Sequence, residues 1–228
     1  MLNLIKKEFI IQKKYLFYYI FYSIFIFVIF SMSSNESAKS AYILAAVSVT
    51  YIFIQYSCAI EDRNNSERIL NSLPISKKSI VLSKYFSLMI FSIIAVILSI
   101  VSGYIISKLD FIKVELIGII DIVTIFFIVS ILAGLYFPVY YKFGYIKAKI
   151  LNIIIFLGFF SSSMLVGQLL KHFAVNDMMN SASAGTIGRL FSEYGDMGIY
   201  IILLGIGLLI LIVSALLSIT IYKRKEFN

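Results

Sequence analysis

Six long apolar runs, separated by short polar segments, dominate this sequence and restrict what it can fold into. Each run is close to or above the roughly 20 residues that a helix needs to cross a bilayer. Backbone groups in hydrocarbon must be hydrogen-bonded within the protein, so the runs are expected to form helices and not open sheets. The runs are Tyr15–Met32, Ser40–Ile60, Ile80–Ser107, Leu116–Tyr141, Ile146–Val166 and Gly198–Tyr222.

Composition supports the same fold class. Hydrophobic residues make up 61% of the chain and charged residues 14%, whereas soluble domains are near half apolar and a quarter charged. The sequence therefore predicts an all-α polytopic membrane protein with six transmembrane helices. These spans occupy most of the 228 residues, so we expect a single transmembrane domain over 1–228.

Basic residues predict the orientation of the chain. Most lysines and arginines fall in segments that lie on one side of the six-span topology, namely 1–14, 61–84, 142–149 and 223–225. The other side has Lys39, Lys108, Lys113, Lys171 and Arg189. The positive-inside rule then places both termini and the 61–79 segment in the cytoplasm. This asymmetry accounts for the net charge of +8 without a nucleic-acid partner.

The first residues allow more than one interpretation. Segment 1–14 is expected to be either an interfacial helix, with Leu2, Ile5 and Phe9 on one side, or a basic flank that anchors the first span. A cleaved signal peptide is a further alternative, but it would leave five spans while the basic residues still fit six.

Motifs for catalysis, nucleotide binding and metal binding are absent from the sequence. None of the twelve glycines is followed by lysine, so the chain has no P-loop. The single histidine, His172, has no acid or nucleophile in a catalytic spacing. We therefore predict a non-enzymatic membrane protein that binds no metal or cofactor itself.

Asp121 is the one acidic residue well inside an apolar run. Carboxylates at membrane depth often mark ion sites or proton relays, so Asp121 is a candidate intramembrane polar site. Its position close to Glu115, near the end of the run, also fits a simple interfacial or packing role.

The polar segment 61–79 (EDRNNSERILNSLPISKKS) has the signals of a short helix. Asn64 and Glu67 have the spacing of a capping box, which predicts a helix over Ser66–Ser72. Pro74 is expected to end it, because proline disfavours helix at the preceding residue. Ser76 is then placed to cap the next helix.

One side of this predicted helix is apolar. Ile69, Leu70 and Leu73 cluster along it, while Glu67 and Arg68 face elsewhere. Such an edge suits either the bilayer surface or a groove in a partner protein, and the residue pattern alone does not separate the two.

The run from Glu61 to Tyr85 resembles the segment after the second span of ABC-2-type transporter permeases. It is most similar to small six-span bacterial permeases related to bacitracin-resistance and phenol-soluble-modulin exporters. The resemblance implies that Arg63–Leu73 is a coupling helix that docks on a separate ATPase subunit, which would hold ATP and Mg²⁺. The implied docking residues are Arg63, Glu67, Arg68, Ile69, Leu70, Leu73 and Pro74.

A second distinctive segment, 167–197, lies on the opposite side of the predicted membrane. It contains two apolar groups at helix-like spacing, separated by the Ser181–Gly185 run. Similar permeases have short outer helices here, which implies an outer gate; a plain surface loop is the alternative. The candidate gate residues are Leu169, Leu170, Phe173, Leu190 and Phe191.

Together these observations predict the permease subunit of an ATP-driven exporter in the bacterial cell membrane. The resemblance implies two ATPase partners, a second copy or a homologous permease, and an amphipathic peptide or hydrophobic antibiotic as substrate. The alternative is a secondary carrier or membrane scaffold that works without an ATPase.

Overall fold

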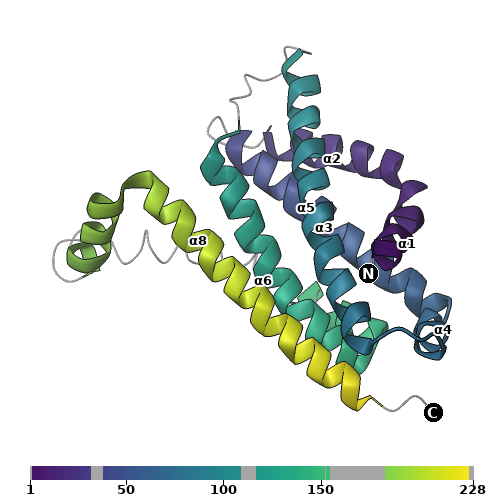
Figure 1. Cartoon of the computed structure of the whole chain (residues 1–228). Helices are drawn as coiled ribbons and strands as arrows, with labels where there is room; N and C mark the ends of the chain where they lie inside the picture. The colour runs from purple at the N-terminus through teal and green to yellow at the C-terminus, as the bar shows by residue number, and fades with distance from the viewer. Residues whose placement is uncertain (1, 32–37, 109–116, 152, 155–182, 226–228) are drawn as a thin grey trace.

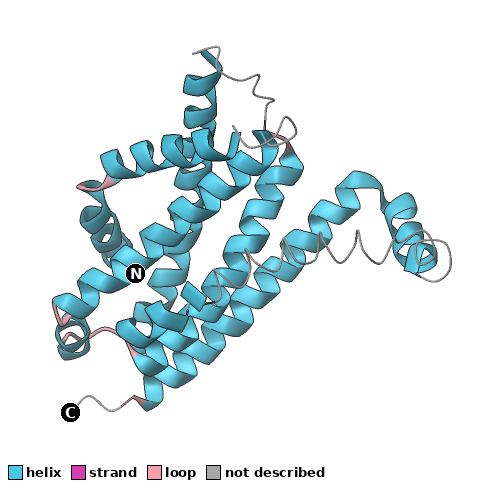
Figure 2. Ribbon diagram, turned by 180° about the vertical axis from the view of Figure 1, so that it is seen from behind, coloured by secondary structure: helices cyan, strands magenta, loops and turns pink. Residues whose placement is uncertain are grey.

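The fold is a bundle of helices, seen here in a computed structural model (Figure 1). The structure describes residues 2–31, 38–108, 117–151, 153–154 and 183–225. All regular secondary structure in these residues is helical (Figure 2). The helices are α1 (Leu2–Lys13), α2 (Leu16–Ser31), α3 (Ala38–Arg63), α4 (Ser66–Ser72), α5 (Lys77–Lys108), α6 (Ile119–Phe143) and α8 (Ser183–Arg224), with a short helix at 145–151.

Four described segments are long and apolar enough to cross a bilayer. They are Ser40–Arg63, Lys77–Lys108, Ile119–Phe143 and Tyr200–Arg224, which correspond to the second, third, fourth and last predicted runs. The first run forms a shorter apolar helix, Leu16–Ile29, and most of the fifth lies outside the described residues. The all-helical, multi-pass prediction is confirmed, while the number of six spans stays a prediction.

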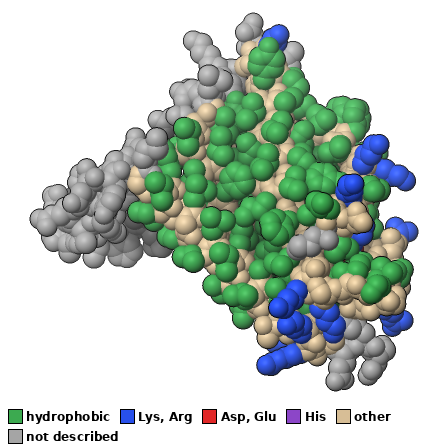
Figure 3. Space-filling view, viewed as in Figure 1, with side chains coloured by type: hydrophobic (Ala, Val, Ile, Leu, Met, Phe, Trp, Pro, Cys, Tyr) green, Lys and Arg blue, Asp and Glu red, His purple; other side chains and the backbone are tan. Residues whose placement is uncertain are grey.

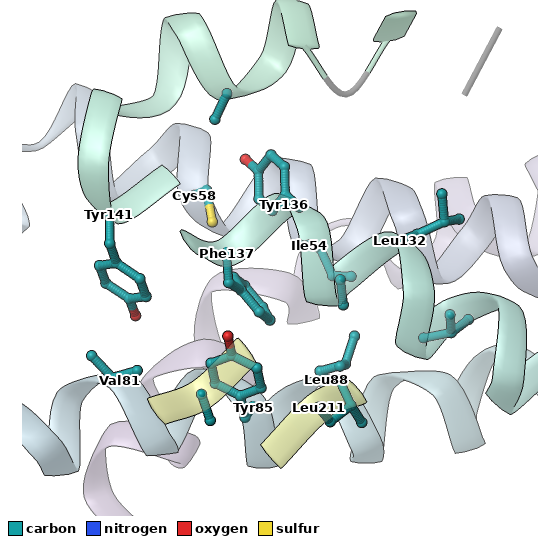
Figure 4. Close-up of a cluster of buried hydrophobic side chains, with 14 of the residues drawn as sticks. Ile54, Cys58, Val81, Tyr85, Leu88, Leu132, Tyr136, Phe137, Tyr141 and Leu211 are labelled. Atoms are coloured by element: carbon teal, nitrogen blue, oxygen red, sulfur yellow. The ribbon is translucent and has the colours of Figure 1, made fainter. Parts of the chain in front are cut away.

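The main core lies where α3, α5, α6 and α8 meet (Figure 4). Aromatic residues of α6 fill its centre: the Phe137 ring lies 4.7 Å from that of Tyr85 in α5 and 5.9 Å from that of Tyr136. Aliphatic side chains from the other helices surround them, including Ile54 of α3 and Leu211 of α8. The core therefore fixes the four longest helices relative to one another.

Small residues bring α6 and α8 together. A Cβ on Gly134 would lie 2.8 Å from the side chain of Ile210, and a Cβ on Gly207 would lie 3.3 Å from Ser130 Oγ. Close approach through small residues is a common way for helices to pack in lipid. Among the described residues, Gly205 of α8 has no neighbouring atom within 4 Å of the position of a Cβ.

Pro138 leaves one backbone carbonyl of α6 without a hydrogen-bond donor in its own helix, and α8 supplies the donor. Proline has no N–H, so the carbonyl of Gly134, four residues earlier in α6, loses its partner within the helix. The hydroxyl of Ser214 in α8 donates to this carbonyl at 2.7 Å. The same hydroxyl lies 2.7 Å from Tyr85 Oη, which is also 2.9 Å from Ser218 Oγ. A backbone defect in α6 is thus satisfied by the helix packed against it.

The N-terminal residues form a helix, as one of the two interpretations expected. Its buried face is different from the predicted one: Leu4, Glu8 and Gln12 point into the protein, while Leu2 is 76% exposed. Gln12 donates to the Phe53 carbonyl of α3 at 2.7 Å and accepts from the Tyr19 hydroxyl at 2.6 Å. Hydrogen bonds to α2 and α3 therefore outweigh the weak apolar pattern of α1.

The last helix starts earlier than the sequence predicted. It runs from Ser183 to Arg224 without a break between the outer segment and the last span. Figure 1 shows it lying along α6 and then extending beyond the other helices at its N-terminal end. The 183–197 part of the predicted gate loop therefore belongs to this helix, and its 167–182 part lies outside the described residues.

Replacing Ser214 with alanine is expected to destabilise the protein by about 1–3 kcal/mol, because the Gly134 carbonyl is left buried without a donor. Adding Pro138→Ala to Ser214→Ala should recover most of this loss, since alanine restores the missing N–H. The single cysteine, Cys58, is buried. Thermal unfolding can therefore be followed in detergent with a thiol-reactive fluorophore.

Ser99→Ala is the matched control for this experiment. Ser99 is also buried in a spanning helix, but its hydroxyl donates to the Val96 carbonyl of its own helix. It should unfold close to the wild-type temperature. A Ser214→Ala variant as stable as Ser99→Ala would contradict the proposed role of Ser214.

Candidate functional site

The helix α4 has the boundaries that the sequence predicted, Ser66–Ser72. Leu73 has an extended backbone before Pro74, as the proline required. Ser76 caps the following helix: its hydroxyl accepts from the Ser79 N–H at 3.2 Å. Local chemistry therefore determines where α4 ends and α5 begins.

The start of α4 differs from the prediction. Its N-cap is Asn65 and not Asn64, with a left-handed backbone (φ 48°) and no side-chain capping bond. Asn tolerates this conformation better than most residues. The expected capping box does not form, because the Glu67 carboxylate pairs with Lys225 instead of reaching back to the backbone.

The predicted docking residues do not share one environment. Ile69 and Leu73 are 60% and 46% exposed, and Arg63, Arg68 and Pro74 are also exposed. We call Ile69 and Leu73, together with the exposed Arg63 and Arg68, the α4 edge. It combines an apolar strip with positive charge.

The two remaining predicted residues face the protein. Leu70 is half-buried and packs against the main core. Glu67 accepts from Lys225 Nζ at 2.8 and 2.9 Å. Leu70 and Glu67 therefore hold α4 on the bundle, and Ile69 and Leu73 remain accessible from outside.

Four charged side chains meet at the base of the α4 segment. Lys84, two turns into α5, lies 2.7 Å from Glu61 in the last turn of α3 and 3.4 Å from Glu8 of α1. Lys7 pairs with Glu61 and lies 3.4 Å from Glu8. We call Lys7, Glu8, Glu61 and Lys84 the buried charge cluster. Its formal charges cancel, which limits the cost of removing them from water.

Neutral groups complete the buried charge cluster. The Ser57 hydroxyl donates to Glu8 and accepts from Lys84 Nζ at 3.1 Å. The Tyr140 hydroxyl donates to Glu61 at 3.3 Å, and Lys84 Nζ lies 5.8 Å from the centre of the Tyr140 ring. Glu8, Glu61 and Lys84 are each less than a tenth exposed. The cluster thus joins α1, α3, α5 and α6 by polar contacts inside the fold.

Asp121 lies at the start of α6. Its carboxylate accepts from the backbone N–H of Gly118 at 2.8 Å, and the residue is buried. A carboxylate in the first turn also complements the positive end of a helix dipole. This contact fits the packing role considered for Asp121, while an ion or proton role stays a prediction.

The candidate outer gate cannot be placed as a unit. Leu169, Leu170 and Phe173 lie outside the described residues, as does His172. Leu190 and Phe191 belong to the N-terminal part of α8. The gate assignment therefore stays a prediction.

Sequence reasoning missed Glu8, Gln12 and the end of α8. Glu8 and Gln12 are four residues apart in a polar segment, as a polar stripe on one helix face would be. That spacing indicates a polar face of α1 that contacts other helices. No local pattern links Lys225 to Glu67, because 158 positions separate them.

Basic side chains gather at the end of the bundle where α4 lies. Figure 3 shows hydrophobic side chains over the middle of one face and most of the visible lysines and arginines toward its lower and right edges. Basic residues occupy the last turns of α3 and α8, next to α4. The site therefore lies at a charged end of an apolar bundle.

Comparison with known families identifies the class of this protein. The family of ABC-2 family transporter proteins matches residues 3–223, almost the whole chain. The chain therefore belongs to the ABC-2 transporter permease family, whose members are membrane components that generally work with separate ABC ATPases. No curated protein and no solved structure gives a match. The resemblance of the Glu61–Tyr85 segment is confirmed at the level of this family.

Lys84→Met tests the buried charge cluster. It leaves two carboxylates buried with Lys7 as their remaining partner, and we expect a loss of about 3–5 kcal/mol of stability. The Cys58 unfolding assay measures this. Adding Glu61→Gln should recover much of the loss, because one carboxylate then again faces one lysine.

Lys78→Met is the control, since Lys78 is exposed in the first turn of the same helix. It should change stability by no more than about 0.5 kcal/mol. Equal effects of the two lysine substitutions would show that the cluster does not stabilise the fold.

Proposed function

We propose that this chain is the membrane subunit of an ATP-driven exporter, and that α4 is its contact with a separate ATPase. Two copies, or this chain and a homologous permease, would enclose the substrate path and bind two ATPase subunits. ATP and Mg²⁺ would be held by those subunits. The observation that carries the proposal is the exposed α4 edge on a helix fixed at both ends.

Exposure makes α4 suitable for docking. Ile69 of α4 and Leu73, the residue that follows the helix, are both exposed and give this edge its apolar surface. Arg63 at the end of α3 and Arg68 of α4 are exposed as well and provide charges for the rim of an interface. Apolar anchors inside a polar rim are typical of small protein interfaces. An α4 edge of this kind fits a shallow groove lined by apolar and acidic residues.

Rigidity makes α4 suitable for passing on a movement. The Lys84–Glu61 ion pair joins α3 to α5, the helices before and after α4 in the chain. Leu70 attaches α4 to the main core. A displacement of α4 by the ATPase would therefore move the ends of two spanning helices, and not only a flexible loop. These contacts support the coupling role that the family resemblance implies.

The topology of the proposal follows the distribution of basic residues. Both termini, α4 and the ATPase would lie in the cytoplasm of a bacterium, with the permease in the cell membrane. Lysines and arginines in the last turns of α1, α3, α6 and α8 support this orientation.

A cavity of about 320 Å³ supports an amphipathic substrate. It is lined by residues of α3 and of the 145–151 helix together with Ile153, and these are tyrosines, aliphatic groups, one glutamine and one lysine. Aromatic walls with a single charged group suit a ligand with an apolar body and a polar or anionic end. Peptides and hydrophobic antibiotics of that kind are the proposed cargo. The lining residues are Tyr51, Ile52, Gln55, Tyr56, Ala59, Tyr145, Lys149 and Ile153.

A secondary carrier is the second candidate, and the buried carboxylates of Glu8 and Glu61 are the observation that favours it. Buried acids often bind the coupling ion in such carriers. Here each acid contacts a lysine, and Glu61 lies in the last turn of α3. This pairing supports a structural role more than an ion site. Transport driven by an ion gradient in vesicles without an ATPase would favour the carrier.

Ile69→Glu and Leu73→Glu test the proposed docking. We expect each to reduce retention of a co-expressed ABC ATPase at least tenfold in co-purification, because a charge replaces an apolar anchor. Both positions are exposed, so the thermal unfolding of the permease alone should be unchanged within about 0.5 kcal/mol.

Asn64→Glu is the matched control, since it adds the same charge at an exposed polar position just before α4. It should retain the ATPase. Full retention by Ile69→Glu and Leu73→Glu would show that the α4 edge is not the docking surface.

A further inference from the structure

The C-terminal end of α8 is attached to α4 by an ion pair. Lys225 Nζ lies 2.8 and 2.9 Å from the two carboxylate oxygens of Glu67. Both side chains are about one-third exposed, so water weakens the attraction. The ammonium group nevertheless lies within hydrogen-bonding distance of both carboxylate oxygens, which keeps the end of α8 close to α4.

A second contact lies one turn further along α4. Asn71 Nδ2 donates to the Tyr222 hydroxyl at 3.0 Å and to the Glu67 carbonyl at 2.8 Å. Tyr222 is fully buried, and its ring lies 5.1 Å from the ring of Tyr141 in α6. Tyr222 therefore connects α4 to the interface between α6 and α8.

A third contact joins the end of α8 to the start of α5. Lys77 Nζ donates to the backbone carbonyls of Lys223 and Lys225, each at 3.4 Å. Carbonyls at the end of a helix lack partners within it and carry partial negative charge, so a lysine is favourable there. Contacts from both α4 and α5 thus converge on the last residues of α8.

The helix α8 extends from these contacts at α4 along α6 to the other end of the bundle. It is one helix of 42 residues, and its N-terminal part bends sharply away from the rest outside the bundle (Figure 1). One end lies on α4, its middle packs closely on α6 through Gly134 and Gly207, and its other end extends beyond the bundle (Figure 1). A helix packed this closely transmits a displacement of its end better than a loop would.

We infer that Lys225 and Tyr222 are positioning residues that make α4 and α8 move together. This inference rests on the proposed function: the ATPase displaces α4, and Glu67 and Asn71 pass the displacement to α8. The last helix thereby becomes part of the path by which ATP hydrolysis acts on the far side of the membrane.

Limited trypsin digestion of the permease alone tests the contact itself. Lys225→Gln and Tyr222→Phe each remove one contact to α4 while keeping similar shape. Cleavage after the exposed Arg68 should become about fivefold faster, because α4 opens more often. Lys223→Gln, the same change at an exposed neighbouring position, should leave the rate unchanged. Mass spectrometry identifies the product.

ATP hydrolysis by the purified complex tests transmission. For Lys225→Gln we expect wild-type retention of the ATPase and an unchanged KM for ATP, with a kcat about fivefold lower. Lys225→Arg should keep the wild-type kcat because it preserves the charge. Exchange of the pair, Glu67→Lys with Lys225→Glu, should restore most of the kcat that Lys225→Glu loses.

The two experiments distinguish the contact between α4 and α8, the transmission of movement through it, and the binding of an ATPase. Unchanged cleavage in Lys225→Gln and Tyr222→Phe would overturn the contact, and faster cleavage with unchanged kcat would overturn transmission. A wild-type permease that binds no ATPase would overturn the proposed function and transmission with it, whereas the digestion would still report on the contact.

Discussion

The ion pair between Lys84 and Glu61 is the interaction on which the α4 end of this protein depends. It joins α3 to α5, the two helices that flank α4 in the chain, at 2.7 Å. Removing two charges from water costs several kcal/mol for each ion, and attraction between them repays this only with good geometry and further hydrogen bonds. Glu8 and Lys7 balance the charge, and neutral hydroxyl groups occupy remaining hydrogen-bonding positions. Lys7 and Glu8 therefore attach the N-terminal helix to the same base.

A second constraint comes from the bilayer, where each backbone group needs a partner inside the protein. Pro138 removes one hydrogen bond within α6, and the Ser214 hydroxyl of α8 donates instead to the Gly134 carbonyl. Gly134 has no side chain, which lets α8 come close enough to make this bond. Contacts at the base and along α6 therefore act on the same helix, because α8 packs on α6 and also ends on α4. This arrangement connects the proposed docking surface with a helix that spans the bundle.

Much of the candidate site follows from the sequence, although not all of it. The end of α4 was predictable because Pro74 acts on the residue before it, whereas the capping box expected at its start does not form. The orientation of α4 was not predictable, because three apolar residues on a short helix can turn more than one side to the bundle. Packing places Leu70 against the core and leaves Ile69 and Leu73 exposed. The capping-box prediction failed for a related reason: Glu67 found a stronger partner in a lysine that is distant in sequence.

The sequence by itself determined the class of this protein, its apolar helices and the position of α4. These features depend on composition and on short-range chemistry, which act wherever the chain lies. Only the tertiary structure decided that Glu8 contacts Lys84, that Ser214 donates to the Gly134 carbonyl of α6, and that Lys225 pairs with Glu67 of α4. Each of these contacts joins residues separated by 76, 80 or 158 positions. Whether such groups meet depends on how whole helices pack, and no local pattern contains that information.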